Sequence, residues 1–259
     1  MLVEAVGLDP SVHEAWFDLG LLHKWSGAWD DALRCNLRAA ELVGERADEP
    51  AWWNLGIAAT ALRDWDVARR AWRVYGLTVP DGEGPIAGDY GLAAVRINPH
   101  SDPEVVWGRR VDPARLRIES VPLPGSGHRW GDIVLHDGEP VSTREVRGVR
   151  HLVFNELERW EASGVPTVAA TVSSDLPAAI SDLLDALEEA GLTAEDWTTN
   201  TAMVCAACST RHEESPPPVP VSGRHEHAIG IAAPIESVRT VVAAWERSHG
   251  GRCHELTTA

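Results

Sequence analysis

The 259-residue chain is long enough to bury a hydrophobic core without disulfides, and its four cysteines are unevenly spaced. Its 39 acidic and 23 basic side chains give a formal net charge of -16, which argues against nucleic-acid partners because their binding surfaces must neutralise phosphates. No apolar run reaches the roughly 18 residues that a membrane-spanning helix needs and no signal peptide is visible, so we expect a cytoplasmic protein with reduced thiols and no membrane partner.

Two segments near the start of the chain, residues 14–43 and 50–80, align with each other at an offset of 36 residues. Each begins with the pattern W-x2-L-G and continues to a small residue in its second half. The matched positions are Trp16, Leu19, Gly20, Ala32 and Ala39 against Trp52, Leu55, Gly56, Ala68 and Tyr75.

This pattern, with Pro80 as the closing proline, resembles the tetratricopeptide repeat, whose period is 34 residues. The resemblance implies antiparallel helix pairs over residues 1–87. About three repeats are normally needed for stability. Since only two and a fraction are visible, we expect the downstream chain to pack against the open end of the array.

In the tetratricopeptide family, the first helix of each repeat lines a concave groove that binds extended peptides. Phe17 and Trp53 stand where the family's carboxylate clamp would have a lysine, so the resemblance favours an apolar, aromatic partner segment. The alternative is that this protein's own downstream sheet fills the groove. The groove positions carried over are Phe17, Leu21, Lys24, Trp53, Ile57 and Thr60.

Residues 88–164 predict a second domain of short strands separated by turns, a small β-barrel or meander. The stretch 154–161 is expected to be a helical turn. Parts of this region resemble an uncharacterised bacterial domain family in which a small β-barrel precedes a ferredoxin-like half, and that resemblance implies no activity. "GSGH" (125–128) and "HD" (136–137) lack the setting of a phosphate loop or catalytic pair, so we expect turns there. The predicted strands cover 105–111, 115–121, 132–138 and 143–149.

Residues 165–259 alternate between strand and helix patterns in the order β-α-β-β-α-β, which is that of a ferredoxin-like split βαβ unit. "GLTAEDW" (191–197) is expected to cap a helix or form a turn. The whole chain is thus a multidomain α + (α+β) protein. The predicted strands cover 167–172, 201–207, 227–233 and 252–258, with helices over 174–191 and from Pro234 onward.

The loop between the two middle strands carries a candidate zinc site. Cys205 and Cys208 end one strand, and His225 and His227 begin the next, so an antiparallel hairpin would bring the four side chains together. Zn²⁺ prefers four such ligands in a closed structural site. Three alternatives are a proline-rich polar loop without an ion, a redox C-x-x-C pair, and substitution of a ligand by one of His212, Cys253 or His254.

Three functional hypotheses follow. The first is a non-enzymatic adapter or scaffold protein that binds a protein or peptide partner and has a structural zinc. Along nearly its whole length the chain resembles uncharacterised tetratricopeptide proteins of actinobacteria, a resemblance that implies no activity. The second is a metal-dependent hydrolase in which Glu213 or Glu226 acts as general base on a metal-bound water. The third is a module that senses a metal or small ligand.

Overall fold

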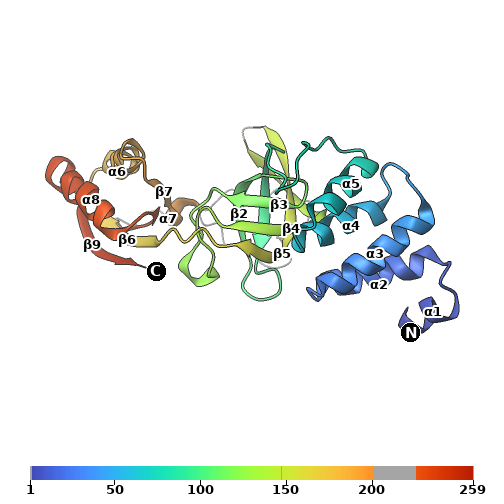
Figure 1. The fold of residues 1–259 in the computed structure, drawn as a ribbon. Helices are drawn as coiled ribbons and strands as arrows, with labels where there is room; N and C mark the ends of the chain where they lie inside the picture. The colour runs from blue at the N-terminus through green and yellow to red at the C-terminus, as the bar shows by residue number, and fades with distance from the viewer. Residues whose placement is uncertain (1, 147, 201–225, 259) are drawn as a thin grey trace.

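The computed structural model describes residues 2–146, 148–200 and 226–258, and combines helices with two β-sheets (Figure 1). Helices at the N-terminal end lie against a closed five-stranded sheet in the middle, and a four-stranded sheet with two long helices lies at the other end. Among the described helices, none is both long and apolar enough to cross a membrane.

The N-terminal part consists of helices that pack in chain order, each against the next. The two segments that align in sequence therefore each contain one pair of neighbouring helices. Asp64 caps the last helix by accepting a hydrogen bond from the Val67 amide at 3.2 Å, and Gly76 ends it in a left-handed conformation. The helices are α1 (Leu2–Leu8), α2 (His13–Trp25), α3 (Trp29–Val43), α4 (Pro50–Ala61) and α5 (Trp65–Tyr75).

Glycines allow the two helices of each pair to approach closely. A Cβ atom added to Gly20 in α2 would lie 2.7 Å from Asn36 Oδ1 in α3. The equivalent atom on Gly56 in α4 would lie 2.6 Å from the ring of Trp72 in α5, which is fully buried. Since neither distance leaves room for a methyl group, the glycine of the W-x2-L-G pattern is required by packing.

Five strands form the middle part, named the closed sheet below. β1 pairs antiparallel with β2 and parallel with β5, so the sheet returns to its first strand. Its interior is apolar, with Ile97, Leu116 and Phe154 among the buried residues. The strands are β1 (Leu92–Ile97), β2 (Glu104–Arg110), β3 (Arg115–Ile118), β4 (Ile133–Val146) and β5 (Val149–Glu161).

Two sequence predictions for this region were wrong. The stretch 154–161, expected to be a helical turn, belongs to strand β5, because it pairs with β4 over most of its length. The predicted strands 132–138 and 143–149 are largely parts of the single strand β4, whose register shifts near Pro140 break the alternating pattern. The His136–Asp137 dipeptide consequently lies in this strand and not in a turn.

The C-terminal part is a sheet of order β7-β8-β6-β9 in which all neighbours are antiparallel. Residues from α6 and α8, including Leu183 and Trp245, join Val168 and Ile231 in one core, so both helices cover the same face. The elements are β6 (Thr167–Ser173), α6 (Pro177–Glu189), β7 (Thr193–Asp196), α7 (Trp197–Asn200), β8 (Glu226–Ala232), α8 (Ile235–His249) and β9 (Arg252–Thr258).

The stretch 191–197 corrects another prediction, because most of it forms strand β7 and the start of α7 instead of a cap or turn. β7 pairs antiparallel with β8, from Thr193 opposite Ala232 to Asp196 opposite Ile229. Four residues are too few for an alternating pattern to be recognised in sequence. The expected strand 201–207 lies outside the described residues.

We expect Gly56→Ala to destabilise the protein by about 1–3 kcal/mol, because the methyl group forces Trp72 or the α4 backbone to move. Helix propensity alone would favour alanine by about 1 kcal/mol. Gly7→Ala, in a helix with nothing within 4 Å of the new methyl group, is the matched control and should be neutral or stabilising. Urea unfolding measures both, and equal effects would contradict the packing role.

Candidate functional site

The predicted peptide groove is covered by the closed sheet. Ile57 and Thr60 are fully buried, and the indole N–H of Trp160 in β5 donates to the Thr60 carbonyl at 3.3 Å. Gly138 in β4 lies so close to Trp53 that an added Cβ would meet the indole nitrogen at 1.7 Å. At these positions the chain's own sheet occupies the space that an extended peptide would need.

The other groove positions lie among the helices or contact the sheet. Phe17 is half-buried and packs on the cluster that contains Ala39 and Trp52. Leu21 is also half-buried. Lys24 is buried and pairs with a carboxylate of the closed sheet.

The Lys24 ammonium donates to Asn54 Oδ1 at 2.9 Å and to Asp137 Oδ1 at 2.8 Å. The Lys24 and Asp137 side chains are 4% and 15% exposed. Burial alone would raise the pKa of Asp137, but the Lys24 charge and hydrogen bonds from Lys24, Gly138 and Trp25 outweigh it and lower that pKa. Lys24 is therefore half of a buried ion pair between α2 and β4.

We expect Asp137→Asn to lower the free energy of unfolding by about 3–5 kcal/mol at pH 7, since it leaves the Lys24 charge buried without a counter-ion. The pKa of Asp137 is lowered from its ordinary 3.8, so its contribution is complete above that value and is lost as pH falls through the folded-state pKa. Urea unfolding at pH 7 and in acid measures the effect.

The matched control is Asp31→Asn, which removes an exposed partner of Arg34 and should change the free energy of unfolding by less than about 1 kcal/mol. If Asp137→Asn is as mild as this control, the buried pair does not hold the two parts together.

One predicted zinc ligand, His227, lies in the described part of the chain, at the start of β8. Its Nδ1 lies 2.8 Å from Asp196 Oδ2, at the end of β7. A neutral imidazole that donates from Nδ1 to a carboxylate has its lone pair on Nε2, which is the arrangement common behind metal-binding histidines. The neighbouring Ala228 amide donates to Thr198 Oγ1 at 2.8 Å, so residues 198 and 228 lie side by side.

The remaining predicted ligands divide into two groups. Cys205, Cys208, His225 and the substitute His212 lie outside the described residues. The other substitutes are on β9, where Cys253 packs on the core beneath the helices and His254 lies 2.7 Å from Ser173 Oγ. Within the described ranges, no three His, Cys, Asp or Glu side chains form a group that could hold a metal.

A cavity of about 450 Å³ lies where the C-terminal end of α2 meets the closed sheet. This size and place are typical of ligand pockets, which often form where two parts of a protein meet. Trp25 is the aromatic group from the helical side, and 59% of it is exposed. The other lining residues come from the closed sheet: Asn98, Pro99, His100, Ser101, Ser126, Gly127, His128, Glu156, Leu157, Glu158 and Arg159.

A buried His–Glu pair forms part of the cavity wall. His128 Nε2 lies 2.6 Å from Glu156 Oε1, and Nδ1 lies 3.1 Å from the Ser126 carbonyl. Burial alone would lower the pKa of His128. The hydrogen bonds to Glu156 and the Ser126 carbonyl, together with the Glu156 charge, outweigh burial, so the pKa is raised above its ordinary value. Both ring nitrogens lie beside acceptors, an arrangement that favours the protonated form of His128.

Sequence reasoning missed this pair. His128 follows a glycine-rich stretch that was interpreted as a turn, and residues 124–126 are indeed a short 3-10 helix followed by left-handed Gly127. Glu156 falls in a stretch expected to be helical. Its apolar neighbours Phe154, Leu157 and Trp160 recur at every third position, which is closer to a helical than to a strand spacing. The local sequence therefore carried no signal that Glu156 lies in a strand.

The joint between the two sheets contains half-buried carboxylates. Trp197 at the start of α7 donates its indole N–H to the Val121 carbonyl at 2.8 Å. The Glu195 carboxylate accepts from the Val121 amide and the Ser120 hydroxyl. Burial, with a smaller contribution from Glu195, raises the pKa of Glu104 to about 7, although the Leu123 amide opposes the shift. The joint thus carries an acid that is half-protonated near neutral pH.

No protein-family model matches the sequence, and no curated protein matches it. A solved structure, described as a hypothetical protein from Neisseria gonorrhoeae, is similar over 63% of this chain and 92% of its own, with 17% identity. Its TM-score of 0.28 is too low to support a conclusion about fold or function.

Proposed function

We propose that this chain is a non-enzymatic interaction protein, an adapter or scaffold, whose binding site is the cavity between α2 and the closed sheet. The observation that carries the proposal is an exposed pair of apolar side chains on α2, of which Trp25 lines the cavity. Leu22 and Trp25 are 51% and 59% exposed, although Lys24 between them is buried. They are three residues apart and so lie on one face of the helix.

The chemistry of the cavity suits an apolar segment of a protein or peptide. Trp25, Leu157 and Pro99 supply apolar surface, while Glu158 and Arg159 lie at the edge with their charges partly satisfied by Trp29 and Gly127. Aromatic anchors surrounded by polar groups are common at protein interfaces. His128 supports binding and not proton transfer, since both of its ring nitrogens are engaged.

The proposal includes the architecture expected from the sequence. Two helix pairs with the W-x2-L-G glycines at their contacts support a short tetratricopeptide array. The strand order β7-β8-β6-β9, with α6 and α8 on one face, supports a ferredoxin-like unit, and the closed sheet between them supports a small β-barrel. In this architecture the repeat groove serves an internal contact, so the partner binds beside the array instead of within it.

Selection of a random displayed peptide library against the protein tests the binding site. We expect enriched peptides to carry apolar or aromatic residues, and to bind a Leu22→Ser, Trp25→Ser variant at least about tenfold more weakly because the exposed anchors are removed. Fluorescence anisotropy of labelled peptides measures the affinities.

The matched control is Val3→Ser, Leu8→Ser, which removes two apolar residues that are 68% and 87% exposed on α1. Peptides that bind both double variants like the unaltered protein would contradict the proposed site.

We also propose a structural zinc ion bound by Cys205, Cys208, His225 and His227, with Asp196 orienting the last of these. The support is the 2.8 Å contact from His227 Nδ1 to Asp196, which leaves the lone pair of a neutral imidazole on Nε2. The close approach of residues 198 and 228 also supports it, since both flank the segment that carries the other three ligands.

Elemental analysis of protein purified without a polyhistidine tag should find about one equivalent of zinc. Cys205→Ala, Cys208→Ala should abolish binding, and Asp196→Asn should weaken it by about 10- to 100-fold because it removes the orienting carboxylate. Cys35→Ala, in the helical part, is the control and should retain the zinc. Less than about half an equivalent in the unaltered protein, unchanged in the double variant, would contradict the site.

A further inference from the structure

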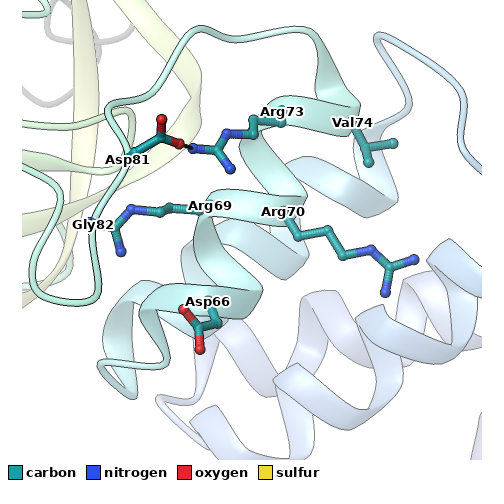
Figure 2. Close-up of a pocket in the computed structure, with 7 residues that line it drawn as sticks. All are labelled: Asp66, Arg69, Arg70, Arg73, Val74, Asp81 and Gly82. Carbon is teal, nitrogen blue, oxygen red and sulfur yellow. Dashed lines mark hydrogen bonds and ion pairs between the residues drawn. The ribbon is translucent and has the colours of Figure 1, made fainter.

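Two arginines on the last helix of the N-terminal part extend toward the same space. Arg69 and Arg73 lie four residues apart on α5, and Figure 2 shows both side chains reaching from the helix toward the stretch that contains Asp81 and Gly82. Together they line a cavity of about 310 Å³. This cavity is separate in sequence and in lining residues from the one beside Trp25.

Arg69 is 5% exposed, and its guanidinium makes hydrogen bonds to carbonyl oxygens only. Nε donates to the Pro80 carbonyl at 3.0 Å, and Nη2 donates to the Gly84 carbonyl at 2.6 Å. In the part of the chain that the structure describes, no carboxylate lies within ion-pair distance of Arg69. A buried guanidinium without a counter-ion is costly, so a site that retains one favours an anion nearby.

Arg73 is paired with a carboxylate that an outside anion can replace. Its Nη2 lies 2.6 Å from Asp81 Oδ1, and the Asp81 side chain is 98% exposed. An ion pair with so exposed a partner contributes little to stability. The Asp81 carboxylate therefore shows that an anion fits beside Arg73. Its pairing is weak enough for another anion to replace it.

We propose that the space between Arg69 and Arg73 binds a phosphoryl group, with Asp81 as the internal carboxylate that the ligand displaces. Guanidinium groups bind phosphate through parallel N–H donors, and two of them match a dianion better than a single carboxylate does. The site is a local exception in a chain whose net charge is -16. It is independent of the peptide site and of the zinc proposed above.

The other charged groups of the cavity set its selectivity. Arg70 points away from this space in Figure 2, and its Nη2 pairs with Glu45 at 3.2 Å. Asp66, at the N-terminal end of α5, also lines the cavity. Its carboxylate repels an anion that extends toward it. A compact phosphoryl group fits these constraints better than a long polyanion does.

Isothermal titration with inorganic phosphate and with a phosphoserine peptide tests the site, with the unphosphorylated peptide as reference. We expect Arg73→Gln to weaken phosphate binding by about tenfold or more, since it removes a charge-assisted contact. Asp81→Asn should tighten binding by about threefold or more, because the competing carboxylate is neutralised. A merely structural Arg73–Asp81 pair would not produce these opposite changes.

Arg38→Gln, which removes a surface arginine of α3 that pairs with Glu41 away from the cavity, is the matched control and should leave phosphate binding unchanged. Tighter binding of the phosphopeptide than of inorganic phosphate would assign the group to a protein ligand, and the reverse would assign it to a small molecule. No measurable binding of either by the unaltered protein and by Asp81→Asn, with melting temperatures unchanged, would overturn the proposal. An equal response of Arg38→Gln and Arg73→Gln would also overturn it.

Discussion

The buried ion pair between Lys24 and Asp137 is the contact on which the arrangement of the N-terminal half depends. Its two charges come from α2 and β4, and removing either one leaves the other buried without a partner. The same carboxylate accepts from the Trp25 indole at 3.3 Å through its second oxygen. One aspartate therefore fixes the helices on the closed sheet and also holds the aromatic wall of the cavity. A change that separates the two parts would remove the cavity as well.

This contact also shows where sequence reasoning succeeds and where it stops. The helix pairs could be predicted because their pattern repeats within the chain and the small residues follow helical spacing. The role of Lys24 could not, because Asp137 is 113 residues away and nothing local indicates that they meet. The same holds for Glu156 on β5, whose partner His128 is 28 residues away in the loop between β3 and β4. Long-range pairing of polar groups is set by topology, which periodicity alone does not determine.

The sequence likewise predicted one part of the candidate metal site and missed another. The Cys and His spacing pointed to His227, which lies on β8, and the predicted partner strand 201–207 lies outside the described residues. Strand β7, which pairs with β8, was not predicted, because residues 193–196 are too few to display a period. Asp196 was missed for this reason, although its carboxylate fixes the orientation of His227. Ligand types follow from spacing, whereas the groups that orient them follow from the strand register.

The proposed adapter function has to use a surface other than the covered helical face. A free repeat array binds peptides in a groove that opens to solvent, but here the closed sheet occupies that face through Gly138 and Trp160. Polar contacts support the walls of the cavity: Asp137, the partner of Lys24, accepts from Trp25, and His128 lies 2.6 Å from Glu156. Binding to a preformed cavity avoids the entropic cost of ordering the receptor. In the proposed function, the docking of the helices on the closed sheet therefore leaves the cavity beside Trp25, and not a long peptide groove, as the binding site.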